Sequence, residues 1–192
     1  MTLNTNTPNP PPASAATPSV YLRRHAQVVH ALIVAGAALL LWQPITLLAF
    51  NPTPEEFGVP GWLGLPGPPT DDPTRWRTAL VSLLPVSGGL YALRQLWRLF
   101  DEYGHGRVFG ATAQEALARF AWAVLLLALL LPVARSLMSM AYSLGNPPGQ
   151  RFVTIGIEWF DGLHLLFGAV LVTIARVMAE ARRLADDNAG FV

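Results

Sequence analysis

The sequence predicts an all-α fold, a four-transmembrane-helix bundle with both termini in the cytoplasm. Hydrophobic residues make up 52% of the 192-residue chain and charged residues only 13%, about half the charge of an ordinary soluble domain. A helix needs about 20 mostly apolar residues to cross the hydrocarbon layer of a membrane, and four segments meet or nearly meet this length. A soluble fold would have too little polar surface to cover all four, so we expect a membrane protein.

The four predicted spans follow one another within residues 23–192, which we take as one membrane domain. The first span carries no charge, and Arg23 and Arg24 precede it as in a signal peptide. Its apolar stretch is longer than the roughly 7–15 residues of a signal peptide, which favours an uncleaved anchor. The second span has Arg94 and Arg98 near its end. The spans run from about Ala26 to Phe50, Ala79 to Leu99, Ala118 to Tyr142 and Trp159 to Met178.

Two segments outside the spans are rich in residues that do not favour helices. Residues 1–22 are uncharged and begin with a stretch of mostly Asn, Thr, Pro, Ala and Ser, which predicts a disordered cytoplasmic tail. The loop from Asn51 to Thr78 holds seven prolines, which excludes a long helix. It is either a hydrophobic lid over a ligand or lipid headgroups, or an interfacial connector anchored by Trp62 and Trp76. Tryptophan is enriched at membrane interfaces, which favours the connector.

The distribution of arginine predicts the orientation, because loops that retain arginine stay in the cytoplasm. All 13 basic residues of the chain are arginine. With both termini inside, which an even number of spans requires, nine arginines lie on the cytoplasmic side and four on the outer side. The outer four are Arg75, Arg77, Arg135 and Arg151, and the inner nine are Arg23, Arg24, Arg94, Arg98, Arg107, Arg119, Arg176, Arg182 and Arg183.

The segment between the second and third spans predicts a compact cytoplasmic corner. Gly104 and Gly106 are expected to end the second helix. Thr112 followed by Glu115 matches a capping box, so the third helix is expected to begin near Ala113. The residues of this corner that we expect to face a cytoplasmic partner are Asp101, Tyr103, His105 and Arg107.

Polar residues inside spans are costly, and one set predicts an ion pair between helices. Arg135 lies 16 residues beyond Arg119, about 24 Å along the third helix. Asp161 lies 15 residues before Arg176, about 22 Å along the fourth. Arg135 and Asp161 therefore reach a similar depth near the outer boundary, with Glu158 one turn away as a second partner. The alternative is that all three side chains extend separately to the outer water.

Other chemistry finds less support in the sequence. Glu158, Asp161 and His164 lie at i, i+3 steps and could bind a metal or relay protons, but no second span supplies further ligands. His30 and His164 lie at different depths, which argues against a haem between them. We therefore expect neither metal nor cofactor. The chain has no cysteine, and it shows no phosphate loop, serine-nucleophile elbow or HExxH motif, so no enzyme is expected. A net charge of +1 argues against direct binding of nucleic acid.

Several short motifs resemble a known family. They are Leu93 to Phe100, Gly106 to Phe109, Thr112 to Glu115, Leu117 to Trp122, and the end from Ala175 to Asn188 with Phe191 and Val192. Over roughly residues 25–192 the chain resembles the bacterial membrane proteins of domain-of-unknown-function family 2975. The resemblance implies a four-span protein of the cell inner membrane without an established activity or catalytic residues. Some family members are encoded beside a small helix-turn-helix regulator, which suggests such a regulator as a partner.

Two functions remain open from the sequence. The first is a non-enzymatic regulatory or scaffolding protein that lies in the lipid bilayer and acts through its cytoplasmic face. The second is a small transporter or channel subunit whose polar outer vestibule is lined by Arg135, Glu158, Asp161 and His164. A continuous buried polar path would favour the transporter, and a closed apolar bundle would favour the regulator.

Overall fold

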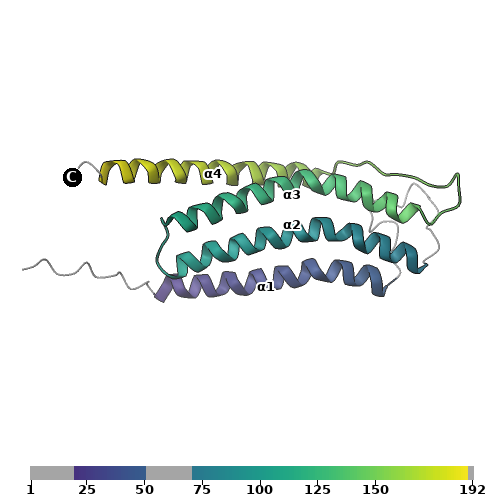
Figure 1. Ribbon diagram of the computed structural model, residues 1–192, viewed down its shortest axis with the longest axis horizontal. Coiled ribbons are helices and arrows are strands. Elements are labelled where there is room, and N and C mark those ends of the chain that lie inside the picture. The colour runs from purple at the N-terminus through teal and green to yellow at the C-terminus, as the bar shows by residue number, and fades with distance from the viewer. Residues whose placement is uncertain (1–19, 51–70, 190–192) are drawn as a thin grey trace, which may run out of the picture.

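A computed structural model describes residues 20–50 and 71–189 (Figure 1). They form four long helices: α1 (Val20–Ala49), α2 (Asp72–Gly104), α3 (Ala111–Ser143) and α4 (Trp159–Ala189). No strand occurs in these two ranges, so the all-α prediction is confirmed. Successive helices run antiparallel, and the start of α1, the α2–α3 turn and the end of α4 lie at one end of the molecule, which we call the corner end (Figure 1).

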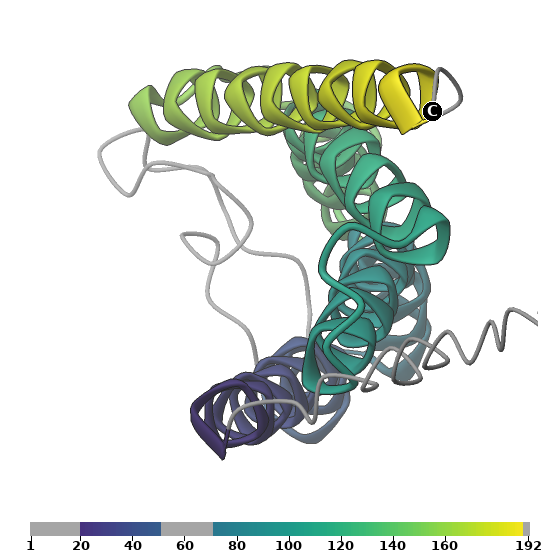
Figure 2. The ribbon, with the colours of Figure 1, turned by 90° about the vertical axis from the view of Figure 1, so that its left-hand side faces the viewer.

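The helices form an open, curved row. α2 packs between α1 and α3, and α4 packs against α3. Viewed from the corner end, α1 and α4 stand at the two ends of the row, with α2 and α3 between them (Figure 2). α1 and α4 do not pack against each other. The predicted number of helices is therefore right, but their arrangement differs from a closed bundle.

Glycine and alanine bring the helices of the row close together. A Cβ atom added at Gly168 would lie 2.7 Å from Leu125 Cα, so the α4 backbone almost touches α3 at this point. Val172 and Ala175 continue the same stripe of α4 and pack against Ala121 of α3. Most of the other α4 side chains are exposed. One face of α4 therefore makes almost all of its contacts.

Small apolar residues and hydroxyl groups are buried along both α2 and α3. Thr78 Oγ1 donates a hydrogen bond to the Thr74 carbonyl (2.9 Å), and Ser82 Oγ donates one to the Ala79 carbonyl (2.7 Å). Hydroxyl groups bonded in this way to their own helix need no partner on another helix. On α3, Ser143 Oγ donates to the Phe152 carbonyl at 2.5 Å, so the segment after α3 folds back along that helix.

The helices are longer than the predicted spans. α2 begins seven residues before the predicted Ala79, and the side chain of Asp71 caps its start by accepting a hydrogen bond from the Thr74 amide at 3.1 Å. α4 continues to Ala189, past the predicted end at Met178. Apolar patterning detects only the part of a helix that lies in lipid, and these polar turns extend beyond it.

The end of α2 follows the prediction, and the start of α3 does not. α2 ends at Gly104, and Gly106 has a φ of 78°, a left-handed conformation that glycine adopts without strain. The predicted capping box is wrong, because Gly110 is the N-cap residue of α3 and makes no side-chain cap bond. The Gly110 amide instead donates to the Arg107 carbonyl at 3.1 Å. This tight turn starts the helix at Ala111, so Thr112 already lies inside its first turn.

Among the helices of residues 20–50 and 71–189, three are long and apolar enough to cross a membrane. The candidate spans are Arg24–Ala49, Ala111–Ser143 and Trp159–Leu184. α2 is not among them, because arginine, serine and glycine dilute its apolar residues. The chain is therefore a multi-pass membrane protein by length and composition. The predicted tail lies outside the described residues except for residues 20–22, which belong to α1, and the part of the proline-rich loop from 51 to 70 lies outside them too.

Candidate functional site

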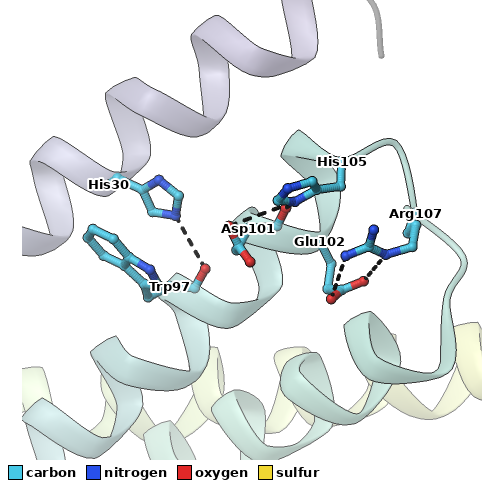
Figure 3. A network of polar contacts seen from close by, with 6 residues as sticks. All are labelled: His30, Trp97, Asp101, Glu102, His105 and Arg107. Carbon is cyan, nitrogen blue, oxygen red and sulfur yellow. Dashed lines mark hydrogen bonds and ion pairs between the residues drawn. The ribbon is translucent and has the colours of Figure 1, made fainter. Parts of the chain in front are cut away.

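The α2–α3 corner is closed by a charged pair. Arg107, just after the turn, donates from Nε to Glu102 Oε2 at 2.7 Å and from Nη2 to Glu102 Oε1 at 3.0 Å (Figure 3). The Arg107 amide also donates to the Glu102 carbonyl at 3.0 Å. This two-pronged geometry is the strong form of an arginine–carboxylate bond. Glu102 was not among the residues expected at this site. In the sequence, the only indication of this ion pair is a carboxylate five residues before Arg107.

The same pair perturbs the acid–base chemistry of the corner. The side chain of Glu102 is only 14% exposed, and that of Arg107 is 55% exposed. The hydrogen bonds from Arg107 hold the pKa of the Glu102 carboxyl below its ordinary value. The corner therefore keeps this carboxylate charged, and Arg107 is partly committed to holding the turn.

Asp101 and His105 lie on the exposed side of the corner. The side chain of His105 is 57% exposed and that of Asp101 is 54% exposed. His105 Nδ1 lies 2.7 Å from the Asp101 carbonyl oxygen, and with a proton on Nδ1 it donates to that carbonyl and leaves Nε2 directed away from it. Both side chains are available to a molecule outside the chain.

Tyr103 turns away from this exposed side. It packs against the buried cluster of Leu99, Ala113 and Ala116. Its ring meets the Phe100 ring edge-on, with 5.6 Å between the centroids. Burial raises the pKa of the Tyr103 hydroxyl. Tyr103 was one of the four residues predicted to face a partner, but it packs on the inside of the corner and stabilises it.

His30 and Trp97 join α1 to α2 beside the corner. The His30 ring stacks on the Trp97 ring at 4.0 Å between centroids, and His30 Nε2 lies 3.3 Å from the Trp97 carbonyl oxygen (Figure 3). A cavity of about 290 Å³ opens next to this contact. It is lined by Ala26, Gln27, His30, Phe100, Asp101, Gly104 and His105. Sequence reasoning missed Trp97, because nothing local to it indicates which helix it meets.

The polar residues predicted near the other end of α3 form a second cluster. Arg135 Nη1 lies 2.5 Å from Glu158 Oε1, and Arg135 Nη2 bonds to Asp161 Oδ2. The Asp161 side chain is only 9% exposed, and it also accepts a hydrogen bond from the Glu158 amide at 2.8 Å. One carboxylate therefore caps the start of α4 and ties that helix to α3.

His164 does not extend this cluster into a metal site. Its Nδ1 lies 2.6 Å from the Phe160 carbonyl oxygen of its own helix, and its side chain is exposed. Within residues 20–50 and 71–189, no group of three or more His, Asp or Glu side chains has a geometry that could hold a metal ion. The two clusters thus stabilise opposite ends of the helices. Of these two clusters, the corner is the one with an exposed charged surface beside a cavity.

Comparison with known proteins gives one match. Residues 66–190 match the sequence family described as "Protein of unknown function (DUF2975)", a range that includes α2, the corner, α3 and all of α4 but not α1. No curated protein and no solved structure matches the chain.

Proposed function

The chain belongs to the family described as "Protein of unknown function (DUF2975)", and from this premise we propose that it is a non-enzymatic regulatory or scaffolding protein of a cell inner membrane. In this proposal all four helices cross the bilayer, and both termini lie in the cytoplasm. The α2–α3 corner then faces the cytoplasm and binds a protein partner. By analogy with the family, the partner is a helix-turn-helix regulator.

The orientation is supported by the charges of the corner end. Arg24 lies near the start of α1, Arg107 lies at the corner, and Arg182 and Arg183 lie near the end of α4. Arginine marks the cytoplasmic side of a membrane protein. α2 runs antiparallel between α1 and α3 (Figure 1), so it crosses the same layer as its two apolar neighbours despite its own lower hydropathy.

The observation that carries the functional proposal is a rigid corner with an exposed charged side. The bond between Arg107 and Glu102 holds the turn, and Tyr103 anchors it to the buried cluster. Asp101 and His105 stay exposed beside the cavity at His30. A surface ordered before binding costs less entropy to dock than a flexible loop does. Such a corner suits recognition of a protein surface.

The transporter alternative receives less support. Buried polar residues of α2 lie in two separate groups, Thr74 to Ser82 towards one end and Gln95 towards the other. Between them the buried residues of α2 are Val86, Gly89 and Ala92. Among the described residues, this apolar section separates the two polar groups along the buried face of α2. This counts against the transporter, while the open row differs from the closed apolar bundle that would favour the regulator.

Binding of the purified regulator tests this function. The detergent-solubilised protein is immobilised, and a small helix-turn-helix regulator of the kind encoded beside some family members is titrated in solution. Because Asp101 and His105 carry the exposed charge of the corner, we expect the double variant Asp101→Ala/His105→Ala to bind about tenfold more weakly. Asp187→Asn, an exposed change at the end of α4, is the matched control and should bind normally. Absence of binding by the unaltered protein would overturn the proposal for this partner.

A further inference from the structure

A groove runs between α2 and α3 on the surface of the row. Its volume is about 540 Å³, within the range of cavities that hold small ligands. It is lined by Ser87, Gly88 and Tyr91 of α2, and by Glu115, Ala118, Arg119, Trp122, Ala123, Leu126, Leu127 and Leu130 of α3. None of these residues takes part in the corner or in the Arg135 cluster.

Small residues create the groove. Gly88 and Ser87 leave space on α2, and a Cβ atom added at Gly88 would lie 3.2 Å from Leu127 Cδ1. Ala118 and Ala123 leave space on α3. The larger side chains on either side act as walls, so the groove follows from residue size along two packed helices.

The groove changes from polar to apolar along its length. Arg119 and Glu115 line the part nearest the corner end, and their side chains form an ion pair at 2.6 Å. From Trp122 to Leu130 the α3 lining is apolar, and Leu130 lies eight residues beyond Trp122, a rise of about 12 Å. One leaflet contributes about half of the roughly 30 Å hydrocarbon layer. The apolar stretch therefore fits within one leaflet.

Arginines gather where the groove turns polar. Arg94 and Arg98 follow Tyr91 at i+3 and i+7 and are exposed, which places them on the same face of α2 as that groove residue. Arg119 lines the groove itself. The guanidinium carbon of Arg176, from α4, lies 5.9 Å from the centre of the Trp122 ring. Arginine therefore lies in the groove, over Trp122 and along the face of α2 beyond Tyr91, and Glu115 is the one carboxylate that lines the groove.

We propose that this groove binds one anionic phospholipid of the bilayer, with a headgroup phosphate at Arg119 and an acyl chain along Trp122 to Leu130. The excess of arginine selects a negatively charged headgroup, since each basic residue near an anionic lipid adds to the attraction between protein and headgroup. Tyr91 and Trp122 lie between the charged and apolar parts, where aromatic rings occupy the level of the headgroups. This inference requires the membrane location but not the regulatory role of the corner.

Native mass spectrometry of the detergent-solubilised full chain tests the site. The probes are phosphatidylglycerol and phosphatidylcholine with identical acyl chains. We expect one phosphatidylglycerol to bind at least fivefold more tightly than phosphatidylcholine. Arg119→Gln should remove most of this preference, whereas Arg183→Gln, which changes an arginine near the end of α4, should keep it. Equal binding of the two lipids, or an equal loss in both variants, would overturn the proposal.

A second measurement reports on the acyl chain and does not depend on a charge variant. Phosphatidylglycerol brominated in the middle of its chains quenches tryptophan fluorescence at short range. The contribution of Trp122 is the difference between the fluorescence of the unaltered protein and that of Trp122→Phe. This contribution should be quenched more strongly by brominated phosphatidylglycerol than by brominated phosphatidylcholine. If the groove is instead covered by a second copy of the chain, the mass spectrum will show a dimer, and this tryptophan will not distinguish the two lipids. That result would also overturn the proposal.

Discussion

At the scale of single residues, Arg135 and Glu102 show how ionic contacts join parts of the chain. Arg135 bonds to both Glu158 and Asp161, and so connects α3 to the start of α4. The sequence alone predicted that Arg135 and Asp161 lie at a similar depth, because the rise per residue of a helix converts a count of residues into a distance along its axis. The direction of Tyr103 and the contact of His30 with Trp97 were not predictable in this way, since they depend on how neighbouring helices are rotated.

The connection between α3 and α4 leads to a first prediction. We expect Arg135→Ala and Asp161→Ala each to lower the free energy of unfolding by about 1–3 kcal/mol, because each removes a bond between charged side chains that joins α3 to α4. The double variant should lose less than the sum of the two, by more than about 0.5 kcal/mol. Unfolding in detergent by denaturant titration measures all four proteins. Additive losses would show that the two side chains act independently.

The corner leads to a prediction about pH. The folded state lowers the pKa of Glu102 through its bonds to Arg107. The resulting stability is present above the pKa of this carboxyl in the unfolded chain, and it is lost as the pH falls through the lowered value in the folded chain. We therefore expect the Tm of the wild-type protein to fall more steeply between neutral and acidic pH than that of Glu102→Gln. Parallel pH profiles would contradict this coupling.

At the scale of elements, hydropathy located all four helices but not their ends. Each predicted span lies within one observed helix apart from Phe50, one residue past α1. The polar turns were missed because caps and short loops, and not lipid, stabilise them. The capping box at Thr112 failed for a related reason. Two glycines, Gly106 and Gly110, allow a tighter turn than the motif assumes, so the helix starts earlier.

The contact between α3 and α4 gives a prediction at this scale. A side chain at Gly168 would collide with the backbone of Leu125, whereas one at Gly162 would meet nothing within 4 Å. We expect Gly168→Ala to destabilise the protein by about 1–3 kcal/mol, since overpacking forces backbone shifts. Gly162→Ala should be neutral or stabilising by up to about 1 kcal/mol, because alanine favours a helix. Thermal unfolding in detergent compares the two, and equal effects would contradict the close approach.

At the scale of the whole molecule, the open row is consistent with lipid as its solvent. Large side chains of α4 such as Phe160, Leu166 and Val177 are exposed. In water this surface would favour closure of the row onto itself. In a bilayer, lipid tails are as apolar as these side chains, so no hydrophobic force draws α4 towards α1. An open row therefore costs little in a membrane.

The proposed orientation gives a prediction for the whole chain. Reporter domains that are active only outside the cytoplasm, fused at either terminus, should be inactive. The same reporter inserted after Gln150, in the segment between α3 and α4, should be active. The reason is the arginine of the corner end, which holds that end in the cytoplasm. Activity at one terminus only would contradict an even number of crossings.

Composition and apolar length alone were enough to predict long apolar helices and to locate all four helices of the described residues, because both are properties of each segment by itself. Three of these four helices are long and apolar enough to cross a membrane. The tertiary structure was needed to show that the helices form an open row and to locate the groove between α2 and α3. It was also needed to show which corner residues face outward. These features depend on which faces of neighbouring helices meet. Where almost every face is apolar, only close approaches such as that of Gly168 to Leu125 select among them.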